Sequence, residues 1–315
     1  MDQAVFIDLG YDMGYVIVAF LAIYLSGWLI YDKVATRGYS LGYSLFEDRN
    51  IAAGFEICGF LMVEMLIAIN AMSGDQVTQM AESGEMVVHY WRDLEAVAVT
   101  IVFSNIVFFV FRYLASVIIK WLYRGKVDNQ GDPVVFNNEI FKQHNIGASL
   151  FSLSYLIIMY FMIFQEDFLG TRGYQVESLI NMTVVFLTGL LVYFFHNIFF
   201  MGKGHTTLDE LFMDNNSGVG MSLVGFMFAV LFLQSKLMLQ FTQEEHFFKT
   251  DTETYLYLGL VFIFILALRR IFIAFLDLFT KRRFKTDFLV EDNPVAGLLD
   301  MVFVCSTGLL LATII

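Results

Sequence analysis

Apolar residues dominate eight separate stretches of this chain. Runs of about 18 or more such residues can cross the apolar core of a lipid bilayer as helices. The eight stretches lie at roughly 12–31, 51–73, 95–119, 146–164, 177–200, 217–235, 254–276 and 294–315. Because lipid offers no partner for backbone N–H and C=O groups, each stretch has to satisfy these groups internally. The pattern therefore predicts an all-α polytopic membrane protein with eight transmembrane helices.

The polar breaks between these stretches contain a repeated pattern. Four times, an apolar pair is followed by three residues and then by an Asn, after which a new apolar stretch begins. The four copies are Leu45 to Asn50, Ile140 to Asn145, Leu211 to Asn216 and Phe288 to Asn293. A unit that recurs in this way indicates an internal repeat. We therefore expect four helix pairs, each with one helix before and one helix after the Asn.

Small residues recur at fixed distances after each Asn. They are Gly54, Ser149, Gly220 and Gly297 at four positions after it, and Gly59, Ser154 and Gly225 at nine. Small side chains let membrane helices approach closely, which is a main packing device in lipid. We therefore expect the second helix of each pair to lie inside the protein, with the Phe-rich first helices outside against lipid.

All four pairs are expected to cross the membrane in the same direction, which makes them parallel repeats. Two arrangements fit this expectation. One is a pseudo-fourfold ring of pairs, and the other is two halves of two pairs each. In the second arrangement, residues 1–164 form the first half and residues 165–315 form the second half.

The repeated Asn has a direct structural interpretation. Asn is a favoured N-cap residue, because its side chain accepts a hydrogen bond from the first free N–H groups of a helix. The predicted caps are Asn50, Asn145, Asn216 and Asn293, the last followed by Pro294 at the first helical position. The functional alternative is that the four helix N-termini converge and hold an anion or line a mouth.

Composition and charge agree with a membrane protein and suggest its orientation. The chain is 58% hydrophobic and only 16% charged. Twelve of its 19 Lys and Arg residues lie in the loops between paired helices, against four on the opposite side. The positive-inside rule then predicts cytoplasmic loops between paired helices and both termini outside. The net charge of −12 and the lack of a long basic stripe exclude a nucleic-acid partner.

Charged residues inside the apolar stretches are the candidates for function, because they are costly at membrane depth. These candidate transport-pathway residues are Glu56, Glu64, Arg112, Arg269, Arg270 and Asp300. Glu64 is the strongest candidate, since it stands mid-stretch without a charged neighbour. Its alternative is a neutral side chain hydrogen-bonded across a helix interface. Arg112 has two open interpretations, as a partner for Glu56 or Asp300 or as a side chain that extends toward the cytoplasmic side.

Other chemistry is mostly missing from the sequence. There is no phosphate-binding loop, nucleophile elbow or His-Glu-x-x-His motif. Among the scattered histidines only His196 lies convincingly within a stretch, so we expect no haem, no metal site and no cofactor. Cys58 and Cys305 are interpreted as small packing residues. We therefore expect that the protein is not an enzyme.

The segment Asp48-Arg49-Asn50-Ile51-Ala52-Ala53-Gly54, continuing to Gly59, resembles a bacterial inner-membrane family typified by YjfL. Members of that family look like one or two copies of a helix pair with an Asn-x-Ala-Ala segment and spaced glycines. The resemblance covers nearly the whole chain as a doubled form. It is weaker in the second pair, where Ser149 replaces a Gly, and in the fourth, where Pro294 follows the Asn. It implies a location in a bacterial inner membrane and an association with envelope stress and membrane remodelling, but no established activity.

Two hypotheses follow for function. The first is passive or proton-coupled movement of a small cation, with Glu64 and Glu56 along the pathway and with Asp300 and Arg269 as gating or pairing residues. The second is a non-transporting membrane scaffold. Its cytoplasmic loops at 120–145 and 277–292 would recruit a peripheral protein or anionic lipid. A homo-oligomer fits either hypothesis.

Overall fold

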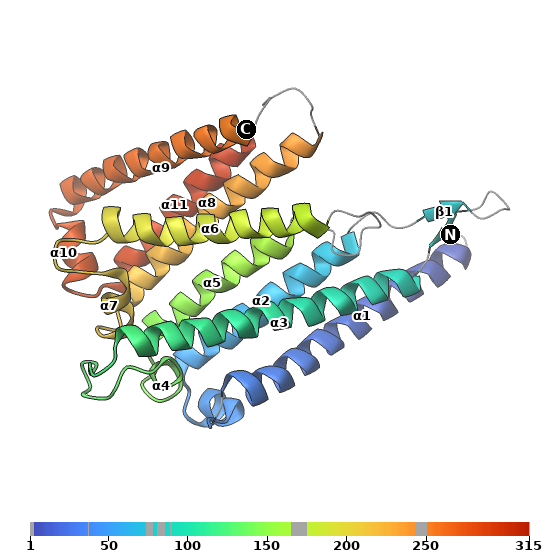
Figure 1. Cartoon of the computed structure of the whole chain (residues 1–315), viewed down its shortest axis with the longest axis horizontal. Coiled ribbons are helices and arrows are strands. Elements are labelled where there is room, and N and C mark those ends of the chain that lie inside the picture. The colour runs from blue at the N-terminus through green and yellow to red at the C-terminus, as the bar shows by residue number, and fades with distance from the viewer. Residues whose placement is uncertain are drawn as a thin grey trace.

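The computed structural model describes residues 3–36, 38–73, 78–80, 86–88, 90–164, 175–243 and 251–314. Eight long helices account for most of them (Figure 1). These are α1 (Gln3–Ile30), α2 (Ile51–Ser73), α3 (Tyr90–Leu122), α5 (Ile146–Phe164), α6 (Gln175–Phe199), α8 (Ser217–Gln243), α9 (Asp251–Thr280) and α11 (Pro294–Ile314). Each is long and apolar enough to cross a membrane. The prediction of an all-α, eight-helix, multi-pass membrane protein is therefore confirmed.

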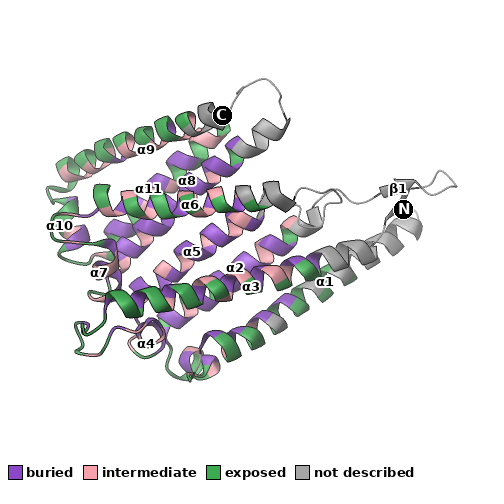
Figure 2. Ribbon diagram, viewed as in Figure 1, coloured by how far each residue is buried: buried purple, intermediate pink, exposed green. Residues whose placement is uncertain are grey.

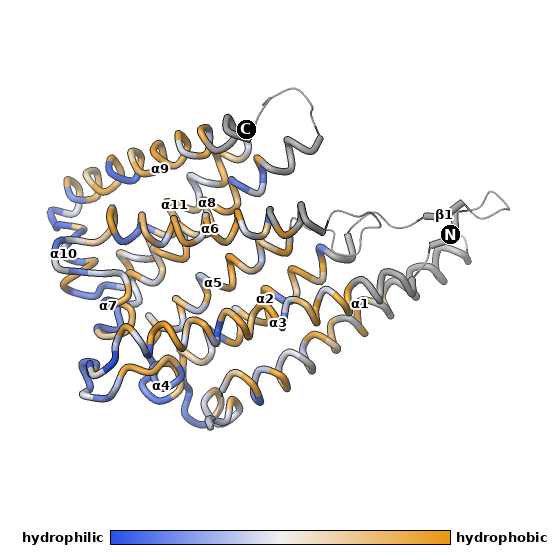
Figure 3. Tube along the Cα trace, in the orientation of Figure 1, coloured by the Kyte–Doolittle hydropathy of each residue, from blue (hydrophilic) through white to orange (hydrophobic). Residues whose placement is uncertain are grey.

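Short helices connect the long ones. They are the π-helices η1 (Tyr31–Ala35) and η2 (Tyr43–Glu47) and the α-helices α4 (Phe136–Phe141), α7 (Thr207–Phe212) and α10 (Phe284–Leu289). Helices α4, α7 and α10 all lie at one end of the bundle, where hydrophilic residues gather (Figure 3). We call this the short-helix end. A small antiparallel hairpin, β1 (Thr78–Met80) with β2 (Met86–Val88), lies toward the opposite end.

Burial separates the long helices into two classes (Figure 2). The membrane-crossing parts of α2, α5 and α8 are 61%, 67% and 78% buried, whereas those of α1, α3, α6 and α9 are only 17–28% buried. The second helices of the first three pairs are therefore inner helices, and the first helices are outer ones. Helix α11 is intermediate at 33%, because it ends the row of inner helices and keeps one apolar face uncovered.

The inner helices form an open row rather than a ring. Helix α2 packs on α5, α5 on α8, and α8 on α11, whereas α2 and α11 do not pack together. Of the two arrangements that the sequence allows, the pseudo-fourfold ring is therefore not formed by the residues described. Helix α5 also packs on α8, so the two predicted halves share one continuous row.

Glycines set how closely neighbouring inner helices approach. A Cβ at Gly297 would overlap the backbone of Gly218 on α8. A Cβ at Gly225 would lie 2.7 Å from the Met301 Cα, and one at Gly220 would lie 2.7 Å from the Leu150 Cβ. Since real Cβ atoms do not come so close to other atoms, side chains at these positions would force the helices apart.

The two glycines of the first pair differ from one another. A Cβ at Gly59 would lie 2.9 Å from the end of the Leu153 side chain, so this position also faces a neighbouring helix. A Cβ at Gly54 would meet only the Leu45 side chain, at 3.9 Å. The expectation of a close helix contact at Gly54 is therefore wrong, because α2 begins the row and no earlier inner helix packs there.

Candidate functional site

The four Asn residues share one local backbone geometry. The residue before each Asn has a left-handed backbone, with φ of 53° at Arg49, 56° at His144, 55° at Asn215 and 49° at Asp292. None of the four is a glycine, which makes this conformation uncommon. The left-handed residue turns the chain from a short helix into the following long helix. The four breaks are therefore structurally equivalent.

Each Asn side chain also caps the helix that follows it. Asn50 Oδ1 accepts from Ala53 N at 3.0 Å. The other three contacts are Ala148 N to Asn145 at 2.9 Å, Val219 N to Asn216 at 3.0 Å and Val295 N to Asn293 at 3.0 Å. These oxygens satisfy N–H groups that a helix leaves free at its start. Because the four helix starts lie along an open row, they do not converge on one mouth.

Two of the Asn amides also tie one pair to the next. Asn50 Nδ2 donates to the Ile140 carbonyl at 2.8 Å, and Asn216 Nδ2 donates to the Phe288 carbonyl at 2.9 Å. In both cases the acceptor lies in the apolar pair that precedes the next Asn. The apolar pairs therefore present backbone oxygens to the preceding unit, a role that the sequence did not reveal.

The amide of Asn145 instead donates to Glu139 Oε2, at 3.0 Å. Glu139 lies on α4, outside the membrane-crossing segments, and its side chain is buried. Burial raises the pKa of Glu139 to about 7, although the hydrogen bond from Asn145 opposes the shift. This carboxyl therefore titrates near neutral pH.

A buried ion pair joins α2 to α3 in the first half of the chain. The Arg112 guanidinium contacts Glu56, and both side chains are almost fully buried. Ser152 of α5 donates to Glu56 Oε1 at 2.8 Å, and the Ser152 oxygen lies 2.7 Å from the Tyr155 hydroxyl. On its other side, Arg112 donates to Asn137 of α4 at 2.9 Å. Three long helices and one short helix therefore meet at this cluster.

Among the described residues, two buried oxygens of the first cluster have no protein partner. They are Glu56 Oε2 and the Tyr31 hydroxyl. The Tyr31 ring lies 5.6 Å from the Arg112 guanidinium, so both orphaned oxygens belong to the surroundings of one arginine. Buried polar atoms of this kind normally bind ordered water.

A second buried ion pair joins α9 to α11. Arg269 Nε donates to Asp300 Oδ1 at 2.7 Å, and its Nη2 donates to Asp300 Oδ2 at 2.9 Å. Ser222 of α8 donates to Asp300 Oδ2 at 2.5 Å. The guanidinium also lies 3.7 Å from the centre of the Phe200 ring. Both carboxylate oxygens of Asp300 therefore have partners.

His196 of α6 extends this second network. Its Nε2 lies 3.3 Å from the Ser222 hydroxyl and its Nδ1 lies 3.1 Å from the Thr207 hydroxyl. His196 is completely buried, and both ring nitrogens have hydroxyl partners. The chain of contacts runs from α7 through α6 and α8 to α11, so it fastens a short helix to the inner row.

The two clusters occupy matching positions in their halves. In each, an acid and a serine from neighbouring inner helices face one another, at six or seven positions after the repeated Asn. Glu56 pairs with Ser152, and Asp300 pairs with Ser222. In each, the arginine comes from the first helix of the later pair. In the first cluster the acid lies on the earlier inner helix and the serine on the later one, whereas in the second cluster the order is reversed. Aligning the sequence on the Asn residues therefore does not place acid against acid.

Glu64 lies two turns beyond Glu56 on α2 and is also buried. The Ser104 hydroxyl of α3 lies 2.8 and 2.7 Å from its two carboxylate oxygens, and Asn105 Nδ2 donates to Oε2 at 3.3 Å. Within the described part of the chain, no cation forms an ion pair with it. Ser104 and Asn105 were not predicted, although adjacent polar residues in an apolar stretch were a visible signal.

Aromatic rings separate the two acids of α2. Phe60 and Phe108 are fully buried, with ring centres 4.5 Å apart, and Tyr31 lies 5.4 Å from Phe60. Phe60 stands midway between Glu56 and Glu64 in the sequence. A layer of buried aromatic rings therefore lies between the two carboxyl groups.

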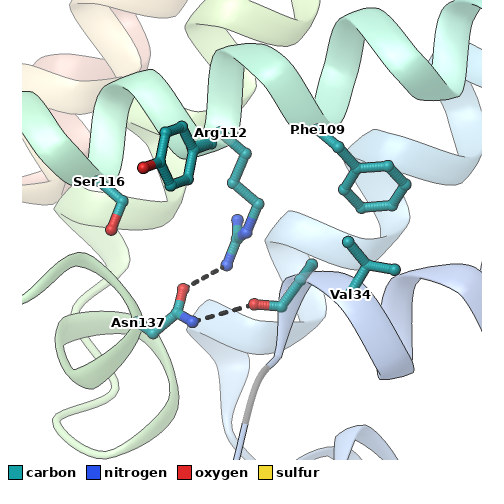
Figure 4. A pocket seen from close by; sticks show the side chains of 7 residues that line it. Val34, Phe109, Arg112, Ser116 and Asn137 are labelled. Atoms are coloured by element: carbon teal, nitrogen blue, oxygen red, sulfur yellow. Dashed lines mark hydrogen bonds between the residues drawn. The ribbon is translucent and has the colours of Figure 1, made fainter.

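A small pocket reaches Arg112 from the outside (Figure 4). It lies between η1, α3 and α4, and its lining includes Ala35, Ser116 and Asn137. Its volume of about 90 Å³ holds a few water molecules. Asn137 of α4 connects α3 to η1, since it accepts a hydrogen bond from Arg112 and donates one to the Ala35 carbonyl at 3.0 Å. The first cluster is therefore adjacent to a space of water-like size.

The remaining predicted residues stand apart from these clusters. Arg270 is exposed on α9, directly after the buried Arg269. Cys58 is exposed on α2, and Cys305 lies 3.5 Å from the Gly225 carbonyl. Within the described residues, no group of three or more His, Cys, Asp or Glu side chains is arranged to hold a metal ion.

Comparison with known proteins found no matching family model, no similar curated protein and no similar solved structure. The resemblance to the YjfL-like family therefore stays a prediction that rests on the Asn-x-Ala-Ala segment and the spaced glycines. Function has to be argued from the clusters themselves.

Proposed function

We propose that this protein moves protons across a membrane through the first half of its helix row. The observation that carries the proposal is Glu64, a buried carboxyl in mid-span whose hydrogen-bond partners are a hydroxyl and an amide. Ionisable residues in such places mark proton relays and ion paths in membrane proteins. No ion pair among the described residues fixes the charge of Glu64, so it is free to exchange a proton.

The route that we propose begins at the pocket beside Arg112. Water in this pocket reaches Glu56, whose free oxygen and nearby Tyr31 hydroxyl provide further places for water. Eight residues of α-helix separate Glu56 from Glu64, a rise of about 12 Å. Glu64 then passes the proton toward the end of α2 that carries the β-hairpin.

The ring layer of Phe60, Phe108 and Tyr31 acts as the gate in this proposal. Apolar constrictions in channels block conduction when they are dry and permit it when water enters. Arg112 at the entrance repels Na⁺ and K⁺, and the pocket holds only a few water molecules. Both features favour protons, which move along hydrogen-bonded water, over hydrated metal ions.

The second cluster does not share these properties. Arg269 and Ser222 occupy both oxygens of Asp300, and His196 has a partner at each ring nitrogen. A closed network of this kind holds helices together, so we assign the Arg269–Asp300 pair to structure rather than to transport.

The test uses purified protein in liposomes that contain a pH-sensitive dye, with a membrane potential set by a K⁺ gradient and valinomycin. We expect wild-type protein to carry protons faster than empty liposomes, and Glu64→Gln to reduce the rate to that of empty liposomes. Glu56→Gln should also slow the flux, because it removes the carboxyl next to the pocket. Glu47→Gln is the matched control, since Glu47 is exposed on η2.

Folding of each variant is checked by elution profile and helical circular dichroism before flux is measured. Wild-type protein that is folded but moves protons no faster than empty liposomes would exclude the proposal. Equal rates for wild type and Glu64→Gln would also exclude it. A Na⁺ or K⁺ flux that Glu64→Gln abolishes would instead establish a cation path through the same helix.

The proposal includes an orientation. Most Lys and Arg residues lie at the short-helix end, so we place that end in the cytoplasm of a bacterium, with both chain termini outside. Cysteine accessibility at Ser40 and at Thr252, which precedes the membrane-crossing part of α9, tests this assignment in intact cells.

A second candidate function, the membrane scaffold, is favoured by helix α10. Phe284, Phe288 and Leu289 are buried beneath it, whereas Lys285 and the preceding Lys281 to Arg283 are exposed. This basic, amphipathic segment suits a peripheral protein or an anionic membrane surface. Replacing the four cations by Gln should abolish partner recovery in a pull-down if the scaffold function is correct, and undiminished recovery would exclude it.

A further inference from the structure

An apolar groove runs between two outer helices in the second half of the protein. Phe195 and Phe199 of α6 form one side, Gly259 and Ile263 of α9 form the other, and Val230 of α8 lies at the base. The lining is apolar apart from Thr188. Its volume of about 510 Å³ is within the range of about 300–1,000 Å³ for ligand sites. All three helices cross the membrane here, so the groove opens to lipid.

Arg270 continues one wall of this groove. It follows the groove residues Leu266, Ile263 and Gly259 by four, seven and eleven positions, which places all four on one face of α9. Its side chain is exposed, and it has no acidic partner among the described residues. A lone cation on an apolar, lipid-facing surface is costly unless an anion compensates its charge.

The charged neighbours of Arg270 do not supply that anion. Arg269 is committed to Asp300 on the opposite face. Asp277 lies two turns farther along α9 and accepts from the Phe284 N–H at 2.6 Å. Lys285 adds a second cation at the same end, with its Nζ beside Gly202, three residues after Phe199.

From these observations we infer that the groove is a binding site for one anionic phospholipid. Its acyl chain lies between α6 and α9 over α8, and its phosphate accepts hydrogen bonds from Arg270. This orientation of the lipid places its head group toward an end of the bundle. Arg270 lies about 6 Å from Leu266 along α9, on the side of the short-helix end, where lipid head groups lie. Arginine suits this role because its planar guanidinium offers paired donors to phosphate oxygens. The site is separate from the proton route proposed for the first half.

The experiment measures lipid retention by the purified full chain in native mass spectrometry. Dioleoylphosphatidylglycerol is the anionic probe and dioleoylphosphatidylcholine is the zwitterionic comparison. We expect wild-type protein to retain one anionic lipid in preference. Arg270→Gln should weaken that binding by about tenfold, the effect of losing a charge-assisted hydrogen bond. Gly259→Leu should weaken retention as well, because its side chain would fill the groove, where a new Cβ meets no atom within 4 Å.

Two control variants separate the site from general effects. Arg124→Gln removes an exposed arginine at the same end of the bundle, and Gly14→Leu adds a side chain at another helical glycine with open space. Both should retain lipid as wild type does. Equal retention of the two lipids by wild type, or wild-type retention by either Arg270→Gln or Gly259→Leu, would overturn the inference. So would displacement of the lipid by free glycerol phosphate at equal concentration, because the groove would then contribute nothing.

Discussion

Arg269 donates two hydrogen bonds to Asp300, one to each carboxylate oxygen, and thereby joins an outer helix to the last helix of the inner row. Helix α11 is the least buried of the inner helices, and this contact fastens it to an outer helix. The Arg112–Glu56 pair is the counterpart of this pair in the first half of the chain. The two differ in that both carboxylate oxygens of Asp300 have partners, whereas Glu56 Oε2 has none among the described residues.

Removal of one member of the Arg269–Asp300 pair should destabilise the protein strongly. We expect Arg269→Met to cost about 3–5 kcal/mol, because it leaves a buried carboxylate without its cation. Replacing both residues by apolar ones, as in Arg269→Met with Asp300→Leu, should recover much of this loss. Thermal unfolding in detergent measures the three proteins. A double variant that is no more stable than Arg269→Met would contradict the expectation.

The Asn caps should differ in their contribution to stability. Asn216 caps α8 and also donates to Glu210, to the Phe288 carbonyl and to Asp292. Asn293 is half-buried, and within the described part of the chain its side chain makes one hydrogen bond, the cap. We expect Asn293→Ala to cost about 1 kcal/mol, the usual value for a cap, and Asn216→Ala to cost at least about 2 kcal/mol. Chemical unfolding of the two variants should place them in that order, and the reverse order would refute the assignment.

Substitution at two equivalent glycines should have opposite effects. Gly297→Ala places a methyl group into the backbone of Gly218, so we expect a loss of about 1–3 kcal/mol from overpacking. Gly54→Ala meets only Leu45 at 3.9 Å, so it should gain about 0.5–1 kcal/mol from helix propensity. Both residues stand four positions after their Asn, which makes each the control for the other. Equal changes in stability for the two variants would contradict the expectation, because they would mean that a neighbouring helix packs against Gly54 as well.

Stability should fall with rising pH through the titration of Glu139. Burial raises its pKa in the folded protein to about 7, above the ordinary value of 4.5. The folded protein therefore binds the proton more tightly than the unfolded chain does, so stability decreases as pH rises from 4.5 to about 7. Glu139→Gln should remove this part of the pH dependence. The measurement is the difference in Tm between variant and wild type across that range, and a constant difference would contradict the assignment.

The apolar pattern predicted the elements accurately because lipid demands long, continuous helices. The stretches at 51–73 and 146–164 coincide with α2 and α5, and the Asn that precedes each is its cap. These are local properties, decided by the residues within a few positions of one another. The division into buried inner helices and exposed outer helices also followed from the small residues of the second helices.

The clusters were only partly visible in the sequence. The sequence offers two possible acids for Arg112, and the structure pairs it with Glu56 rather than with Asp300. The sequence marks Glu64 as an unusual carboxyl, but its partners Ser104 and Asn105 lie 40 and 41 residues away on another helix. Pattern within one helix carries no information about which face of another helix lies opposite.

Eight membrane-length helices, four helix caps and the residues whose charge is costly in lipid follow from the sequence alone, because these features depend on local composition and on the solvent. The open row of inner helices, the contact between Glu56 and Arg112, and the groove beside Arg270 emerge only from the packing of the helices in space. Those relationships depend on the relative rotation and order of whole helices. Several packings of the same apolar surfaces satisfy one hydropathy pattern, and side-chain fit selects among them.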